Sequence, residues 1–211
     1  MKIQILVDNI NSWIIPYARK LEENLNRIGH TVNLFHLAEE IVEGDILCLL
    51  SCEKKIKQLN LNKYNLIVHE SNLPSGKGWS PLTWQILEGE NKIPVTLIEA
   101  TDSFDSGEIY LQKNLVLEGH ELVDELRELQ GTATIDIILE FITNIKTIQS
   151  VKQIGEETFY PRRNHSNSEL DIYKTISEQF NLLRVVDNDR YPAFFIKDGI
   201  KYKILISKFV E

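Results

Sequence analysis

His69 and Asp105 are the side chains of this sequence best suited to acid–base chemistry. His69 ends an apolar run, and Asp105 opens a turn that contains a glycine. Transfer of an acyl group to an amine needs a proton acceptor, a donor for the oxyanion and a carboxylate that orients the base. Both residues follow expected strands, where an open α/β sheet forms its ligand sites. Taken alone, a strand-end histidine is more often structural and an aspartate near glycine is ordinary turn chemistry, and the sequence does not pair residues 36 positions apart (105 minus 69).

The residues around His69 form an ordered motif. Residues 68–89 read VHESNLPSGKGWSPLTWQILEG, and residues 105–109 read DSGEI. The order and spacing of these residues resemble the active-site stretch of the folate-dependent formyltransferases. The positions that carry the resemblance are His69, Ser71, Leu73, Pro74, Gly76, Gly78, Pro81, Trp84 and residues 105–109. The resemblance implies a formyltransferase-like (Rossmann-like) α/β fold with a mostly parallel sheet flanked by helices.

The resemblance also implies 10-formyltetrahydrofolate as the cofactor, with its formyl carbon between His69 and Asp105. His69 would stabilise the oxyanion or relay the proton, and Asp105 would orient and polarise the imidazole. Two loops are implied to hold the cofactor. Their residues are Ser51, Cys52, Glu53 and Lys54 in the first and Ala100, Thr101, Asp102 and Phe104 in the second. Without the resemblance, residues 51–54 are an ordinary solvated loop.

One position departs from the family pattern. The family has an asparagine two residues before the histidine, where this chain has Ile67. That asparagine is taken to hold the formyl oxygen, and loss of one oxyanion donor typically costs about 2.7 to 4 kcal/mol of transition-state stabilisation. Ser71 and Asn72 are the candidates to replace it, whereas Asn65 lies roughly 13 Å along the strand from His69. The alternative is that Ile67 packs in the core and the His69 cation suffices.

The acceptor of the formyl group is expected to be a nucleotide-linked amino sugar. Residues 8–13 contain no glycine that would let the backbone approach a phosphate, which disfavours a purine-pathway substrate. A net charge of −8 and a short C-terminal tail disfavour tRNA. The stretch GKGWSPLTWQILEG resembles formyltransferases acting on 4-amino-4,6-dideoxy sugars, linked to UDP or dTDP, including those of pseudaminic-type pathways for surface polysaccharides.

Arginines in the C-terminal part suit the diphosphate of such a substrate, because guanidinium groups bind phosphate oxygens bidentately. A solvated basic patch, or a pair with Asp171, is the alternative for these arginines. The residues expected to bind the nucleotide sugar are Asn9, Asn11, Ser12, Lys77, Gly78, Trp79, Arg162, Arg163 and Arg184.

Two other functions stay open at this stage. Because Ile67 replaces the family asparagine, the chain could bind folate with little catalysis. It could also hydrolyse formyltetrahydrofolate, with water in place of the amine, although such hydrolases carry an additional N-terminal regulatory domain that does not precede Met1 in this sequence.

The composition fits an ordinary globular protein. The 211 residues are 43% hydrophobic and 26% charged, and no apolar run is long enough to cross a bilayer. The N-terminus does not resemble a signal peptide, so a cytoplasmic location is expected. Cys48 and Cys52 are expected to be reduced, and no metal site is predicted.

Apolar periodicity predicts strands near residues 1–7, 31–37, 45–50, 66–69 and 95–100, with helices at 14–28, after Pro81, and from 118 to 144. Gly131 is expected to interrupt the last of these helices. We expect a catalytic core at residues 1–150, followed by an appendage at 151–211 with a helix at 172–183 and a β-hairpin that turns at residues 197–199. The hairpin residues Phe194, Phe195 and Ile204 are a candidate homodimer interface, and packing onto their own core is the alternative.

Overall fold

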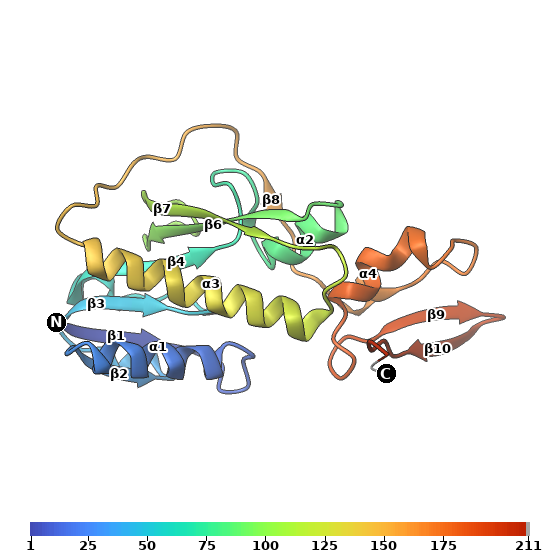
Figure 1. Cartoon of the computed structure of the whole chain (residues 1–211), viewed down its shortest axis with the longest axis horizontal. Coiled ribbons are helices and arrows are strands. Elements are labelled where there is room, and N and C mark those ends of the chain that lie inside the picture. Colours follow the sequence, from blue (N-terminus) through green and yellow to red (C-terminus); the bar gives the residue numbers. More distant parts are fainter. Residues whose placement is uncertain (210–211) are drawn as a thin grey trace.

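The core of the chain is one six-stranded sheet with the order β2-β1-β3-β4-β6-β7. The structure is a computed structural model that describes residues 1–209. Four neighbouring strands are parallel, and β6 runs antiparallel to them, between β4 and the edge strand β7 (Figure 1). The four parallel strands are β1 (Lys2–Leu6), β2 (Thr31–Phe35), β3 (Gly44–Leu49) and β4 (Asn62–His69). The strand β6 (Lys92–Glu99) is antiparallel to both of its neighbours, so β7 (Ile109–Val116) runs in the direction of the first four. The expected mostly parallel α/β sheet is confirmed.

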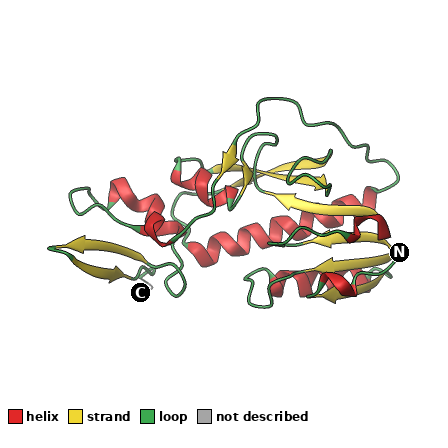
Figure 2. Cartoon of the chain, turned by 180° about the vertical axis from the view of Figure 1, so that it is seen from behind, coloured by secondary structure: helices red, strands yellow, loops and turns green. Residues whose placement is uncertain are grey.

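Two helices cover one face of the sheet. They are α1 (Ile15–Arg27), which has a proline in its first turn, and α3 (Val123–Asn144) (Figure 1). In the view from the opposite side, the sheet lies in front of α3 (Figure 2). Side chains of β3 alternate between two clusters, because successive residues of a strand point to opposite faces. Ile46 and Cys48 pack on the helix side, while Leu47 and Leu49 pack against loops and short 3₁₀ helices on the other side.

The cysteines are both free thiols, as expected. Burial raises the pKa of Cys48 and of Cys52 to about 12, so both thiols stay protonated at neutral pH.

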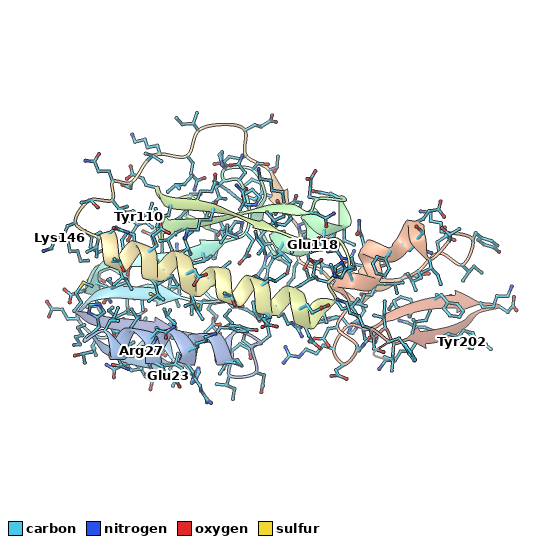
Figure 3. The ribbon with its side chains drawn as sticks, in the orientation of Figure 1. Glu23, Arg27, Tyr110, Glu118, Lys146 and Tyr202 are labelled. Carbon is cyan, nitrogen blue, oxygen red and sulfur yellow. The ribbon has the colours of Figure 1, made fainter. Side chains whose placement is uncertain are left out.

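The helix α3 runs unbroken through Gly131, so the expected interruption there is wrong. A Cβ at this position would lie 2.4 Å from the ring of Tyr17 in α1. The glycine therefore serves helix–helix contact and does not end the helix. At the other end of α3, Phe141 packs against Tyr110 of β7 with ring centroids 4.7 Å apart (Figure 3).

The segment after α3 returns to the His69 motif. Val151 forms an isolated antiparallel bridge with Ile109, and β8 (Phe159–Tyr160) pairs with β5 (Lys77–Gly78) inside the motif. Trp84 of α2 (Pro81–Leu87) strengthens this junction, because its indole N–H donates to the Pro161 carbonyl at 2.9 Å. Residues that are distant in sequence thereby come beside the motif.

The C-terminal elements project from one end of the sheet (Figure 1). They comprise α4 (Phe180–Val185) and the hairpin of β9 (Ala193–Lys197) and β10 (Ile200–Ile204), and the turn is the predicted one. The expected helix at residues 172–183 is wrong in its extent. Side chains cap the turns there instead: the Glu178 carboxylate accepts from the Thr175 amide, and the Gln179 amide donates to the Asp171 carbonyl.

The hairpin packs onto its own small core. Phe194 is buried, while Phe195 and Ile204 pack against a cluster formed by Leu170 and Leu183. Tyr202, farther out on β10, is 43% exposed (Figure 3). The homodimer and the division at residue 150 stay predictions. Within residues 1–209, no helix is long and apolar enough to span a bilayer.

The contact at Gly131 generates a test of the packing between α1 and α3. Alanine would favour the helix by about 1 kcal/mol, but overpacking typically costs about 1–3 kcal/mol. Gly131→Ala should therefore lower the free energy of unfolding in urea. In a Tyr17→Leu background the same substitution should be neutral or stabilising, because the ring is gone. Equal destabilisation in both backgrounds would contradict the contact.

Candidate active site

A cleft of about 770 Å³ opens at the ends of the parallel strands. Loops after β1, β3 and β4 line it, as expected for an open α/β sheet. Its lining falls into two groups. Residues 49–56, Ile67 and residues 100–104 form one arm, which we name the loop arm. The start of α2, the first half of α3 and parts of residues 162–191 form the other, which we name the helix arm.

The structure brings His69 and Asp105 together. His69 Nδ1 lies 3.5 Å from Asp105 Oδ1, and both side chains are largely buried. The other ring nitrogen, Nε2, lies 2.8 Å from the Gly76 carbonyl oxygen. Both ring nitrogens thus face oxygens that can only accept, a carbonyl and a carboxylate. This arrangement suits an imidazole that carries a proton on each nitrogen.

The backbone around Asp105 is fixed by three amide contacts. The Gly78 amide donates to Asp105 Oδ2 at 2.9 Å, and the Gln153 side chain donates to the carbonyls of Asp105 and Gly107, each at 2.8 Å. Gly107 lies so close to β6 that a Cβ there would be 1.7 Å from the Glu99 carbonyl oxygen. The loop therefore has little freedom to move its carboxylate.

Lys77 does not line the cleft, and its expected role in substrate binding is wrong. The side chain is 1% exposed, and its ammonium donates to Glu157 at 2.6 Å and to Ser106 at 2.9 Å. A buried charge needs such partners, because desolvation would otherwise disfavour it strongly. Lys77 instead connects the His69 motif to Ser106 in the loop that carries Asp105, and to Glu157 in the segment that follows α3.

Arg184 is also buried away from the cleft, which corrects its predicted role in phosphate binding. It is 1% exposed and forms an ion pair with Glu121 at 2.7 Å, while Asn91 accepts a further hydrogen bond from it. Burial acts to raise the pKa of Glu121, but backbone amides of Glu118 and Gly119 and the Arg184 charge outweigh it and lower that pKa.

The residues expected to hold the cofactor all line the loop arm. Asp8, which the sequence analysis did not single out, shapes this arm: its carboxylate accepts from the amides of Glu53 and Lys54 at 2.9 Å. Ile67 lines the same arm and lies between Leu49 and Ile98 in the sheet. The cofactor role of these residues stays a prediction.

Ser71 and Asn72 do not line the cleft, so neither is placed to replace the family asparagine. The Ser71 carbonyl accepts from the Thr96 hydroxyl at 2.6 Å, and Asn72 Oδ1 accepts from Gln112 at 3.1 Å. These contacts hold the segment against β6 and β7. Asn65 is engaged as well, since its side-chain amide donates to Leu59 and Glu99.

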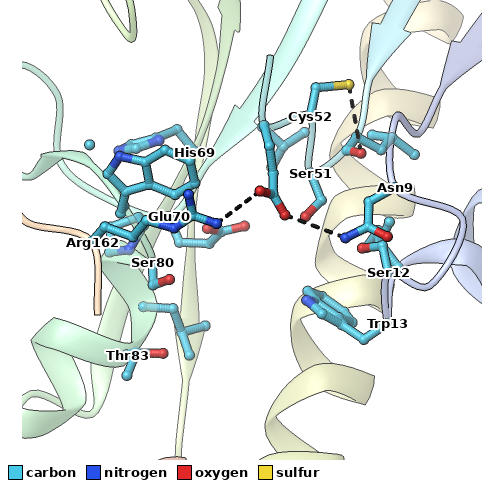
Figure 4. Close-up of a pocket in the computed structure, with 18 of the residues that line it drawn as sticks. Asn9, Ser12, Trp13, Ser51, Cys52, His69, Glu70, Ser80, Thr83 and Arg162 are labelled. Carbon is cyan, nitrogen blue, oxygen red and sulfur yellow. Dashed lines mark hydrogen bonds and ion pairs between the residues drawn. The ribbon is translucent and has the colours of Figure 1, made fainter. Parts of the chain in front are cut away.

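Several residues expected to bind the nucleotide sugar do line the cleft: Asn9, Ser12, Gly78, Trp79, Arg162 and Arg163. Asn11 does not, and its carbonyl accepts from Arg190 instead. The Arg162 guanidinium lies over the Trp79 ring, 4.5 Å from its centroid. It pairs with Glu53 at 2.9 Å, and Glu53 in turn accepts from Asn9 (Figure 4).

The Nε atom of Arg163 is buried and has no hydrogen-bond partner within residues 1–209. Burial lowers the pKa of this guanidinium, because the charged form loses hydration.

Sequence reasoning missed several cleft residues, among them Glu70, Arg127, Gln130 and Arg190. Glu70 gave a local signal, since it is a carboxylate directly after His69 in an otherwise apolar and small-residue stretch. Arg127 and Gln130 belong to the long helix α3, and Arg190 to a polar turn. In neither place does the local sequence distinguish a cleft residue from a solvated one.

Comparison with known proteins bears out the expected family. The family model described as formyl transferase matches residues 40–138, a stretch that contains His69 and Asp105. These residues are similar to the formyl transferase family, a family of enzymes.

The relatives found by sequence include two methionyl-tRNA formyltransferases. That of Ehrlichia canis is 25% identical over 192 residues, which cover 87% of this chain and 62% of the relative. That of Flavobacterium johnsoniae is 33% identical over 163 residues, which cover 72% of this chain and 50% of the relative. The chain therefore spans between half and under two thirds of these relatives' lengths.

Three solved structures share the fold. Methionyl-tRNA formyltransferase from Clostridium thermocellum has a TM-score of 0.82 and 22% identity, over 100% of this chain and 94% of that one. HypX from Aquifex aeolicus in complex with tetrahydrofolic acid has a TM-score of 0.78 and 19% identity, over 95% and 36%. A sugar N-formyltransferase from a Shewanella species has a TM-score of 0.67 and 16% identity, over 100% and 99%.

The buried pair of Arg184 and Glu121 generates a stability prediction. Arg184→Met should lower the free energy of unfolding by about 3–5 kcal/mol, because it leaves the Glu121 carboxylate buried without its partner. Arg19→Met, on the exposed face of α1, should change it by less than about 0.5 kcal/mol. Urea denaturation measures both. A change at Arg184 as small as that at Arg19 would contradict a structural role.

Proposed function

We propose that this chain transfers a formyl group from 10-formyltetrahydrofolate to the amine of a nucleotide-linked amino sugar. The observation that carries the proposal is the contact of Asp105 with His69, which lines the cleft. The family of residues 40–138 supports formyl transfer as the reaction. Nothing about the acceptor follows from the family alone.

The site residues have separate roles in this proposal. An imidazole with two N–H groups can donate one of them to the oxygen on which negative charge develops as the amine attacks. In the structure one ring nitrogen faces the Gly76 carbonyl, so a substrate oxygen would have to displace this contact to accept from that nitrogen. Asp105 holds the ring in place, while Gly78 and Gln153 hold Asp105.

The loop arm fits the proposed cofactor. Leu49, Leu50, Ile67 and Ala100 give it apolar walls, and residues 51–54 add backbone polar groups, which together suit a flat heteroaromatic ring. HypX, which shares the fold, was solved in complex with tetrahydrofolic acid, and this supports a folate as the cofactor. When bound, 10-formyltetrahydrofolate supplies an activated formyl group.

The helix arm fits an anionic acceptor. Arg162 and Arg163 line it beside Asn9 and Ser12, and Arg190 lines the same end. Arg163 Nε lacks a partner there, and a phosphate oxygen could supply one. The fold shared with the sugar N-formyltransferase from Shewanella supports a sugar substrate. A soluble, cytoplasmic site of action is part of this proposal.

A methionyl-tRNA acceptor is the second candidate, because the sequence relatives carry that name. Binding of tRNA relies on positive charge that displaces counterions from phosphates, and this chain has a formal net charge of −8. We therefore rank the sugar first.

The reaction can be followed by mass spectrometry. The protein is incubated with 10-formyltetrahydrofolate and with UDP- or dTDP-linked 4-amino-4,6-dideoxyglucose, and in parallel with methionyl-tRNA. A gain of one formyl group on a sugar is expected, and His69→Ala and Asp105→Asn should each slow it by about 10³-fold or more. Formylation of methionyl-tRNA alone would contradict the proposed acceptor, and no product on any acceptor would contradict formyl transfer.

The arginines of the helix arm give a separate prediction on binding. Arg162→Met should raise the KM for the nucleotide sugar by about tenfold or more, with a smaller change in kcat, because a charged hydrogen bond contributes roughly 1.5–3 kcal/mol. Arg19→Met, on α1, is the control. Stability should hardly change, since Arg162 and Glu53 are half-exposed. An unchanged KM would remove Arg162 from the substrate site.

A further inference from the structure

We propose that the Glu70 carboxylate binds the ammonium group of the acceptor beside His69 and takes the proton that the nitrogen must lose before it attacks. This inference rests on the proposed function and names the group that prepares the amine. Glu70 directly follows His69 in the chain and lines the cleft (Figure 4).

The backbone of Glu70 is fixed, while its carboxylate, which Gln130 faces, forms no ion pair with a lysine or arginine of the described residues. The Gln85 side chain of α2 donates to the Glu70 carbonyl at 2.5 Å. No lysine or arginine within residues 1–209 lies within 4.0 Å of the carboxylate, and Glu70 is only 9% exposed. A buried carboxylate without a cationic partner is costly, which is unusual unless a cationic ligand supplies one.

Groups from three elements face Glu70. They are His69 of β4, Gln130 of α3 and Asp105 of the β6–β7 loop. Burial raises the pKa of Glu70, with Asp105 acting in the same direction, and His69 and Gln130 oppose this shift. A carboxyl group with a raised pKa is a stronger base than an ordinary one.

Two arginines that line the cleft are paired with other carboxylates. Arg127 pairs with Asp187 at 2.6 Å and Arg162 with Glu53 at 2.9 Å, so neither forms an ion pair with Glu70. Ser80 and Thr83 line the cleft below Glu70 with hydroxyl groups that suit a sugar (Figure 4). The carboxylate, the hydroxyls and the arginines of residues 162–163 thus line one cleft.

Both protons that the acceptor nitrogen loses during formyl transfer are accounted for. The acceptor ammonium gives one proton to Glu70, and the neutral nitrogen forms a bond to the formyl carbon. The bond between that carbon and its carrier nitrogen breaks, and the carrier nitrogen takes the second proton, which the new amide loses. Glu70 then releases its proton to solvent. No oxidant, reductant or metal is needed.

Glu70→Gln tests the proposal because it keeps the size of the side chain and removes its basicity. With UDP- or dTDP-linked 4-amino-4,6-dideoxyglucose as acceptor, kcat/KM at pH 7 should fall by about 10²-fold or more. The loss should be smaller at pH 9, where more of the free amine is already neutral. Glu70→Asp should keep part of the activity. The control Glu128→Gln, on the exposed face of α3, should match the unmodified chain.

Two further measurements separate this role from packing. The Kd for tetrahydrofolate should be unchanged in Glu70→Gln, because the loop arm is untouched. The thermal unfolding temperature should rise at pH 7.5 by about 2–4 °C, equivalent to roughly 1 kcal/mol. Because the pKa of Glu70 is raised in the folded chain, its contribution to folding stability is fully present below the ordinary pKa of 4.5 and is lost as the pH rises. The increase in unfolding temperature of Glu70→Gln over the unmodified chain should therefore vanish toward pH 4.5.

These measurements distinguish a failure of the role proposed for Glu70 from a failure of the proposed formyl transfer. If the unmodified chain forms no formylated product, formyl transfer fails and the role of Glu70 fails with it. If the unmodified chain is active and Glu70→Gln is equally active, only the role of Glu70 is overturned. A loss that is constant from pH 7 to pH 9, or a lower unfolding temperature at pH 7.5, would assign Glu70 to packing and would also overturn the proposal.

Discussion

The buried contact between His69 and Asp105 is the interaction on which the rest of the site depends. His69 is fixed by the pairing of β4 with β6, which places it opposite Thr96, and Asp105 is fixed by the loop that joins β6 to β7. Both side chains are largely buried, and each supplies the other with a polar partner in a place where water is largely excluded. Donors that are held in such a place stabilise developing charge most strongly.

Several conspicuous residues of the motif support this pair and do not meet a substrate. Gly78 donates its amide to Asp105, Lys77 ties the motif to the Asp105 loop, and Gly107 allows that loop to lie against β6. Trp84 donates a hydrogen bond to Pro161 in the segment after α3, and this segment places Arg162 and Arg163 in the cleft. The stretch from His69 to Trp84 therefore contacts both arms of the cleft. A change in this stretch would disturb the cofactor side and the acceptor side together.

Apolar periodicity, a local signal, allowed five strands of the sheet and α1 to be predicted, and the family resemblance implied the pairing of His69 with Asp105. The strand β7 was not predicted, since it lies at the sheet edge and only one of its side chains is buried, so it shows no apolar alternation. Arg184 and Lys77 were misassigned because charge in a sequence does not show whether a side chain will be buried against a partner from 63 or 80 residues away. Glu70 was overlooked because its neighbours from α2 and α3 are brought to it only by the fold.

A double-mutant cycle between His69→Ala and Asp105→Ala on the rate of formyl transfer tests the central claim most directly. Two residues that act as one unit give strongly non-additive losses. The account predicts that each single variant loses most of the activity and that the double variant is scarcely slower than the worse of the two, with tetrahydrofolate still bound by all three. Losses that multiply in the double variant would show that the two side chains act independently, and would contradict the site described above.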